Sequence, residues 1–412
     1  MSLIKPFRGL RPAPHHATDV AAPPYDVLST AEARVRAAGK PWSFLHISKP
    51  EIDLPPDTDP YAPAVYAKAV ENLAKMMQAG ILHRDSQPLY YAYRIEMGNH
   101  TQTGFVAAAS VAAYDAGRIK KHEFTRPDKE DDRVRQIAAL NAQTGPVLLA
   151  YPDSRQADGL LAQACAGAPV AEVVADDSIR HSIWVVSDET LIADITAAFE
   201  AMHALYIADG HHRSAAASRV AASRRAANPT HTGNESYNYF LSVIFPQHQM
   251  KIMDYNRVVK DLNGLSADEF LARVGKCYAV APACDAVKPS CPGEVGLYLP
   301  GRWYRLNIDP KLFVSDPVAR LDVSLLSDHV LGPVLGITDL RRDKRIEFVG
   351  GIRGLPELEK RVNSGDMAAA FAMYPTQMAD LIAVAEAGKI MPTKSTWFEP
   401  KLADGLVSHV LD

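Results

Sequence analysis

Short hydrophobic runs alternate with amphipathic, helix-forming segments along the whole chain. Turn-forming residues bound these runs, and their β-branched and aromatic content favours strands. The expected strands are Pro88 to Met97, Gly104 to Tyr114, Pro146 to Tyr151, Ser182 to Ser187, Leu205 to Ala208, Phe240 to Phe245 and Arg302 to Ile308. The pattern predicts a mixed α/β (α+β) fold.

Capping residues mark the expected helix starts. Ser29 with Glu32, and Ser266 with Glu269, have the spacing of a capping box, and Asp188 can cap a further helix. The expected helices run from Ser29 to Gly39, from the residues after Pro60 to Gly80, from Asp188 to about His203, from Ser214 to Ala227, and onward from Ser266. Helices and strands are therefore interspersed.

The length and composition indicate a folded protein with more than one lobe. The chain has 412 residues, of which 47% are hydrophobic and 22% are charged. This is an ordinary globular balance, and the length suits about two or three lobes. Turn-forming residues between Arg257 and Gly264 mark a boundary. We expect an N-terminal lobe of residues 1–257 and a C-terminal α+β lobe of residues 258–412.

Charge and hydropathy exclude several classes of partner. The net charge is −4, so no overall positive field would hold a nucleic acid. No apolar run reaches the ~20 residues that cross a bilayer, and the N-terminus lacks the apolar segment of a signal peptide. The four cysteines form no Cys-x-x-Cys pair. We expect a cytoplasmic protein with neither nucleic acid nor membrane as partner; the sequence does not indicate its oligomeric state.

The densest candidate chemistry is the turn Asp209-Gly210-His211-His212-Arg213, between an apolar strand and a strong helix former. The first turn of a helix has unsatisfied N–H groups and a positive dipole, so it suits an anion such as phosphate. Arg213 adds a bidentate fork, and Gly210 allows close approach of a ligand. We expect His212 and Arg213 to be partly exposed there.

Two other interpretations of this turn remain open. In the first interpretation, Asp209 is only the N-cap of the helix, Gly210 relieves backbone strain in the turn, and the two histidines are polar surface residues. In the second, a metal is bound at His211 or His212, although adjacent helical residues project about 100° apart and share an ion poorly.

The segment His122-Glu123-Phe124-Thr125-Arg126 precedes a run of charged residues and a predicted helix. Thr125 is expected to cap that helix, with Asp128 in its first turn and Glu130 on a solvated face. This structural role leaves His122 and Glu123 unexplained. Glu123 is the better candidate for a general base.

Two further segments carry candidate site residues. Pro23 and Pro24 are rigid and could orient Tyr25 and Asp26, although the segment favours a purely structural turn. Lys394-Ser395-Thr396 is compatible with phosphate, and the neighbouring Trp397 and Phe398 could simply dock the tail. The motifs of P-loop NTPases, Rossmann dehydrogenases, zincins and α/β-hydrolases are missing from the chain.

Four motifs together resemble one known family. They are APPYDV, HEFTRPDKEDDR, YIADGHHRSAAA and MPTKSTWFEPK, in this order. The chain is identified on them as a member of the domain-of-unknown-function 1015 family (DUF1015), with Thr393 where a second proline is expected. The resemblance implies a ParB/sulfiredoxin-like region, in which an anion-binding turn lies at a helix N-terminus, plus an additional α+β C-terminal lobe. Some proteins similar in this turn are free-serine kinases.

The resemblance also implies roles for individual residues. Gly210, His212, Arg213, Lys394, Ser395 and Thr396 would bind the nucleotide and its phosphates. Tyr25, Asp26, His122 and Arg126 would bind the substrate. Glu123, Asp209 and His211 would be catalytic, with Asp209 assisting a metal or the substrate hydroxyl.

The expected function is phosphoryl transfer from ATP or ADP, with Mg²⁺, to the hydroxyl of a small metabolite such as free serine. A nucleotide-binding regulator without turnover is the first alternative. A metal-dependent hydrolase is the second.

Overall fold

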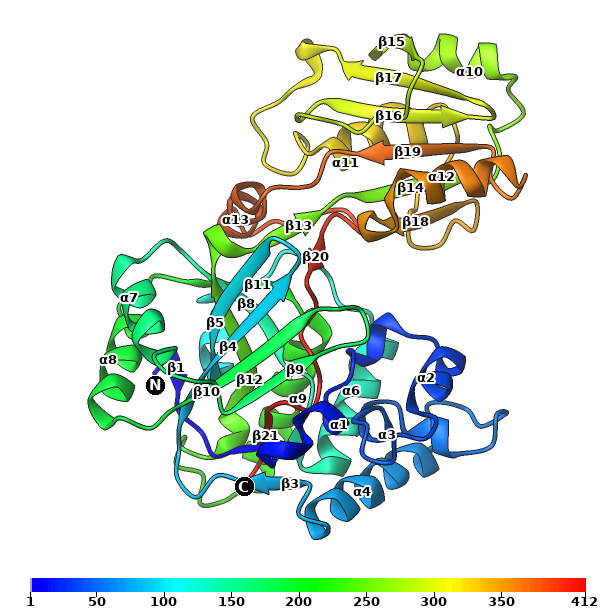
Figure 1. Cartoon of the computed structure of the whole chain (residues 1–412). Helices are drawn as coiled ribbons and strands as arrows, with labels where there is room; N and C mark the ends of the chain where they lie inside the picture. Colours follow the sequence, from blue (N-terminus) through cyan, green and yellow to red (C-terminus); the bar gives the residue numbers. More distant parts are fainter. Residues whose placement is uncertain (1) are drawn as a thin grey trace. The chain divides into compact units, whose positions relative to one another are not determined.

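The chain folds into two compact units, and the computed structural model describes residues 2–412 (Figure 1). Unit 1 comprises Met1–Met250 and Pro400–Asp412, and unit 2 comprises Lys251–Glu399. The division falls between Met250 and Lys251, before the expected 257/258 boundary. A boundary after Arg257 would cut strand β14 (Tyr255–Val259) in its middle. The last segment of the expected C-terminal lobe belongs to unit 1.

Unit 1 contains a large mixed sheet and a small one. Its strands are β1 (Ile4–Lys5), β2 (Gly9–Pro12), β3 (Leu82–Arg84), β4 (Tyr90–Met97), β5 (His100–Ser110), β6 (Ile119–Lys120), β7 (Ala142–Gln143), β8 (Val147–Tyr151), β9 (Ala171–Val174), β10 (Arg180–Val186), β11 (Leu205–Asp209), β12 (Tyr239–Pro246) and β21 (Ser408–Val410). The large sheet has the order β6-β11-β8-β12-β5-β4-β10-β9, with β1 on β5, and the small sheet has the order β3-β2-β21-β7. The C-terminal strand is therefore an inner strand of the small sheet.

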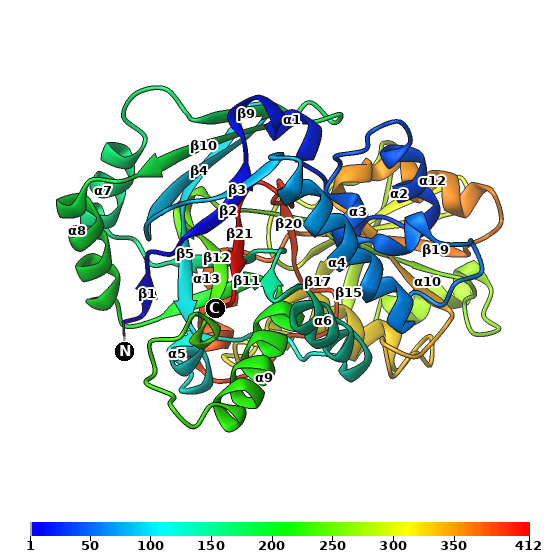
Figure 2. The same ribbon diagram turned by 90° about the horizontal axis from the view of Figure 1, so that it is seen from below.

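Helices pack against both sheets of unit 1. They are α1 (Ala17–Val20), α2 (Thr30–Ala37), α3 (Leu45–Ser48), α4 (Pro63–Gln78), α5 (Val111–Asp115), α6 (Pro127–Leu140), α7 (Arg155–Ala164), α8 (Glu189–Glu200) and α9 (His211–Ala227), with short 3₁₀ turns at Pro14–His16, Tyr25–Val27, Pro50–Asp53, Ser236–Asn238 and Gln247–Gln249. Helix α6 packs on α9, and α7 packs on α8 (Figure 2). Their apolar faces bury a core that includes Phe105, Tyr151 and Phe199.

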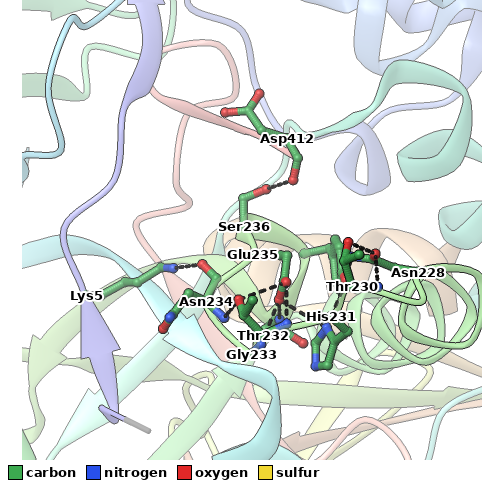
Figure 3. A network of polar contacts seen from close by, with 12 residues as sticks. Lys5, Asn228, Thr230, His231, Thr232, Gly233, Asn234, Glu235, Ser236 and Asp412 are labelled. Atoms are coloured by element: carbon green, nitrogen blue, oxygen red, sulfur yellow. Dashed lines mark hydrogen bonds and ion pairs between the residues drawn. The ribbon is translucent and has the colours of Figure 1, made fainter.

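The connection from α9 back to β12 is organised around Glu235 (Figure 3). This carboxylate accepts hydrogen bonds from the N–H groups of Thr232 at 2.6 Å and Gly233 at 2.9 Å, and lies 3.0 Å from a ring nitrogen of His231. Ser236 donates to the backbone of Asp412. The loop therefore joins the end of α9 to the last residues of the chain, which follow β21.

Unit 2 is built on an antiparallel sheet of order β15-β17-β16-β19-β14-β18, with a separate β13-β20 pair. Its strands are β13 (Lys251–Met253), β14, β15 (Tyr278–Ala283), β16 (Glu294–Leu299), β17 (Arg302–Ile308), β18 (Ile346–Gly350), β19 (Ala369–Met373) and β20 (Trp397–Glu399). Its helices are α10 (Ala267–Val274), α11 (Asp322–Leu326), a π-helical turn Ser327–Leu331, α12 (Gly354–Asn363) and α13 (Met378–Glu386), with 3₁₀ turns at Pro310–Leu312 and Gly351–Arg353.

The structure confirms the mixed α and β class and most of the expected elements. Both capping boxes form, at Ser29 and Ser266, and Asp188 caps α8. All four cysteines are unpaired. Across residues 2–412, none of the helices combines the length and the apolarity needed to span a bilayer.

Three local expectations are wrong. Residues 111–114 are not strand, because the Ser110 hydroxyl accepts a hydrogen bond from the Ala113 N–H and starts α5. Thr125 does not cap α6; its hydroxyl donates to Glu130, whose side chain is only 17% exposed and therefore not on a solvated face. Helix α9 begins at His211, so the two histidines and Arg213 form its first turn.

Candidate functional site

Gly210 joins β11 to α9 in a left-handed conformation, with φ of 102°. The first helical hydrogen bond runs from the Ser214 N–H to the Gly210 carbonyl, and no side chain caps this helix start. The N–H groups at the beginning of a 17-residue helix thus remain available to a ligand. Anion binding at this helix start remains a prediction.

Gly210 is needed for both its conformation and its space. A Cβ atom here would lie 3.2 Å from Nε of Arg213 and 3.3 Å from Cα of Val147. We expect Gly210→Ala to lower the free energy of unfolding by more than the ~1–2 kcal/mol of a left-handed alanine alone. Gly39→Ala is the control, since Gly39 has φ of 73° but a Cβ atom there would meet nothing within 4 Å. Equal losses for both variants in urea unfolding would contradict the steric argument.

Asp209 lies between two cations. Its carboxylate is 3.0 Å from Nζ of Lys401 and 3.5 Å from Nη2 of Arg213. Burial acts to raise the pKa of Asp209, but Lys401 and Arg213 outweigh it and hold that pKa well below its usual range. Asp209 is therefore an ionised carboxylate that orients two cations, and it is not the N-cap of α9.

Arg213 is more enclosed than expected, with a side chain only 10% exposed. Its guanidinium donates to the Pro146 carbonyl and lies 3.7 Å from Asp26 and 3.5 Å from Asp209. Burial opposes its charge, yet the surrounding carboxylates raise the pKa of Arg213 above its usual range. An anionic ligand would join, or displace, carboxylates that already surround this cation.

His122 and His211 come from different segments and meet edge to face, with ring centroids 4.5 Å apart. The His122 backbone N–H donates to Nε2 of His211 at 3.3 Å, and Nδ1 of His211 is 3.9 Å from Oε2 of Glu123. Burial lowers the pKa of His122 to about 4 and that of His211 well below its usual value. Both imidazoles are therefore neutral near pH 7.

The imidazole of His212 contacts the backbone of the HEFTR segment. Nε2 of His212 accepts a hydrogen bond of 3.0 Å from the Arg126 N–H. Burial is the main cause that lowers the pKa of His212, with Arg213 acting in the same direction. The Arg126 guanidinium turns instead to Asp128, 2.7 Å away, in an exposed pair. The structure thus joins the HEFTR segment to the histidine turn at two points.

Tyr25 and Asp26 lie near Arg213 in a 3₁₀ turn. Burial raises the pKa of Tyr25 to about 12, and the Arg133 guanidinium lies 3.9 Å from its ring centroid. Tyr25, Arg133, Gly145 and Arg213 help to line a cavity of about 30 Å³. A cavity of this size has room for ordered water between these polar groups. Asp26 is 42% exposed and is the accessible carboxylate of the group.

Sequence reasoning missed Lys401 and Asp404 as members of this cluster. Lys401 is the last residue of the MPTKSTWFEPK motif. Its pairing with Asp209 depends on where the C-terminal segment lies. Asp404 forms a backbone bridge with Ala22, which places it beside the Tyr25 segment. Burial raises the pKa of Asp404 to about 7, although Arg213 acts to lower it. No nearby sequence signal indicates either contact.

The raised pKa of Asp404 predicts a pH-dependent stability. Between about pH 4 and pH 7, Asp404 is protonated in the folded protein and ionised in the unfolded chain. The free energy of unfolding therefore falls as the pH rises through this range, and it stays level above pH 7. Asp404→Asn should reduce the difference in unfolding free energy between pH 5 and pH 8 by about 3 kcal/mol. Urea unfolding of parent and variant at both pH values measures this. Parallel pH profiles would contradict it.

Lys394, Ser395 and Thr396 lie in unit 2, whereas the turn lies in unit 1. The Lys394 carbonyl accepts a hydrogen bond from Arg257, and the Ser395 hydroxyl donates to the Pro392 carbonyl at 2.6 Å. The Ser395 carbonyl accepts from Thr376. These contacts give the segment a structural role within unit 2; its role in phosphate binding remains a prediction.

Comparison with solved structures gives several distant neighbours. A mutant free serine kinase in complex with AMP has a TM-score of 0.37 and 12% identity, covering 73% of this chain and 92% of its own. Another mutant free serine kinase, in complex with ADP, has a TM-score of 0.35 and 13% identity, over 73% and 92%. SbnI with C-terminal truncation from Staphylococcus aureus has a TM-score of 0.37 and 11% identity, over 73% and 85%. Likeness at this level carries no argument about activity.

No curated protein matches the chain significantly. A family model described as protein of unknown function (DUF1015) matches residues 4–324. That range includes the PPYD, HEFTR and DGHHR segments, and it extends over most of the chain. The chain therefore belongs to the DUF1015 family.

Proposed function

We propose that this protein is a phosphotransferase that moves a phosphoryl group from ATP or ADP to the hydroxyl of a small metabolite. The observation that carries the proposal is the start of α9, where uncapped N–H groups lie beside Arg213. Phosphoryl transfer needs mainly positioning and charge neutralisation, which such a helix start and its cations supply.

The residues around the turn divide into proposed roles. The backbone at Gly210, with His212 and Arg213, would hold phosphate oxygens. Asp209 would keep Lys401 and Arg213 oriented, since both cations lie within 3.5 Å of its carboxylate. Glu123 would accept the proton of the acceptor hydroxyl, because its side chain is 40% exposed beside His211.

A divalent cation would accompany the nucleotide. Mg²⁺ is usually held by one or two carboxylates together with substrate phosphates. Asp26 fits this role best, being exposed, whereas Asp209 is occupied by Lys401 and Arg213. Mg²⁺ would supply neutralisation of charge on the transferred group.

A ligand screen followed by product analysis tests the proposal. A nucleotide that binds only the folded state must raise the melting temperature. We expect ATP or ADP with Mg²⁺ to do so, and serine is the first acceptor to test because the turn resembles that of free-serine kinases. A nucleotide-dependent shift without any phosphorylated product from a panel of hydroxyl metabolites would instead indicate a regulator. The absence of any shift would overturn nucleotide binding itself.

One observation favours a second candidate function, a metal-dependent hydrolase. His122, Glu123 and His211 bring two imidazoles and a carboxylate together. Hydrolysis of a phosphate or acyl ester without nucleotide, abolished by a chelator, would support this function over phosphotransfer.

A further inference from the structure

We propose that His122, Glu123 and His211 form a binding site for one divalent transition-metal ion. The proposal concerns binding alone and does not depend on the phosphotransferase activity. It also differs from a Mg²⁺ ion carried by nucleotide phosphates, since its ligands come from the protein.

Two segments far apart in the chain supply the three donors. Each residue offers one ligand atom, and these atoms lie within 4.8 Å of one another. Of these atoms, Nδ1 of His211 and Oε2 of Glu123 lie 3.9 Å apart. Two ligand atoms bound to one zinc ion at about 2.0–2.2 Å lie somewhat closer together than the 3.9 Å of this pair. A small movement of the two side chains toward each other would therefore allow both to bind the ion. The difficulty that adjacent histidines cannot share an ion disappears, because His212 is not needed.

The buried imidazole of His122 is the second, independent observation. The residue is 1% exposed, and neither ring nitrogen has a partner that satisfies hydrogen-bond distance and angle. Buried polar groups normally have partners, and one without them calls for an explanation such as an ion. The Ile207 carbonyl is near enough to influence the ring. A carbonyl that faces one nitrogen of an imidazole orients the other for metal binding.

Binding requires one local rearrangement. Nε2 of His211 accepts the His122 N–H, so the ring proton lies on Nδ1, toward Glu123. If Nδ1 is to bind a metal, the proton must move to Nε2, and the 3.3 Å hydrogen bond is given up. That bond is long, and its loss is the main change that the site demands.

The donor set selects the class of ion. Imidazole nitrogens suit zinc, cobalt and other late transition metals, whereas Mg²⁺ prefers oxygen ligands alone. Three protein ligands with a fourth position left open are typical of catalytic rather than structural zinc. Glu123 is 40% exposed, so the open position would face solvent. A carboxylate that binds through one oxygen keeps its second oxygen for a substrate hydroxyl.

The test uses the full chain after treatment with a chelator. Calorimetric titrations with ZnCl₂, CoCl₂ and MgCl₂ are expected to show one zinc or cobalt ion per chain, bound at least 100-fold more tightly than magnesium. The visible absorption of bound Co²⁺ would report nitrogen and oxygen ligands directly. Failure to bind either zinc or cobalt with this stoichiometry overturns the proposal.

Matched variants separate this site from other histidines. Glu123→Gln should weaken zinc and cobalt binding at least 10-fold, and His122→Asn should do the same. The control is His248→Asn, which removes an exposed imidazole 3.1 Å from Asp153 and should leave binding unchanged. Parental affinity in Glu123→Gln overturns the assignment. Because Glu123 is partly exposed, this variant is expected to fold even if His122→Asn does not.

Nucleotide titrations on the same samples keep the two proposals distinct. Mg²⁺-nucleotide binding that persists without zinc or cobalt binding would contradict the metal site and leave the phosphotransferase intact. Zinc or cobalt binding without any nucleotide binding would support the metal site and contradict the phosphotransferase.

Discussion

Replacing Arg213 by alanine is expected to lower the free energy of unfolding by about 3–5 kcal/mol, the usual cost of removing one partner from a buried ion pair. The guanidinium is only 10% exposed and lies within 4 Å of Asp26 and Asp209. Its loss leaves the Pro146 carbonyl without this donor and Asp209 with Lys401 as its remaining cation. Urea unfolding measures the loss.

Arg219→Ala is the matched control on the same helix. Arg219 is 47% exposed and pairs with Glu130 and Asp131, so its loss should cost at most ~1 kcal/mol. Calorimetry at a temperature where both variants remain folded should show nucleotide binding lost in Arg213→Ala alone. Similar small stability losses in the two variants would contradict the buried cluster, and parental nucleotide affinity in Arg213→Ala would contradict its role in phosphate binding.

Glu123→Gln is expected to reduce turnover by ~10²- to 10⁴-fold while nucleotide affinity stays within a few-fold of the parent. The amide keeps the size of the side chain but can neither accept the substrate proton nor bind a metal as a carboxylate. Because the side chain is 40% exposed, the melting temperature should barely change. Initial rates and calorimetric titration on one preparation measure both effects.

The control for Glu123 must be a truly exposed carboxylate. Glu130 is unsuitable, because its side chain is only 17% exposed and accepts a hydrogen bond from Thr125. Asp131→Asn is better, since Asp131 is 46% exposed on the same helix as Glu130. Equal, small losses of turnover in Glu123→Gln and Asp131→Asn would remove Glu123 from the mechanism. Loss of nucleotide affinity in Glu123→Gln would assign it to positioning instead.

Elements with local signals could be predicted from the sequence. The capping boxes at Ser29 and Ser266 depend on residues three positions apart, and both form. Val111 to Tyr114 reads as a continuation of an apolar strand, but the Ser110 hydroxyl competes locally and starts a helix. Thr125 shows the same competition, since its hydroxyl finds Glu130 rather than a helix N–H.

The site was predictable in its segments and not in its contacts. The turn at Gly210 and the HEFTR segment both stand out in the sequence, and the structure joins them through the backbone N–H groups of His122 and Arg126. The burial of Arg213 and its neighbours Lys401 and Asp404 could not be predicted, because these contacts arise from strand order in the folded sheets. Lys401 and Asp404 lie just before β21, which pairs with β2 and β7 in the folded protein.

The placement of Pro400–Asp412 in unit 1 has a consequence for biosynthesis. Unit 2 is an insertion in the sequence of unit 1, and the strand that completes the small sheet is made after it. A nascent chain can expose the Gly210 turn early, yet it lacks the Lys401 partner of Asp209 until translation has passed unit 2. The cluster around Arg213 is therefore assembled late, and a ribosome that stalls within unit 2 would release a chain without this part of the site.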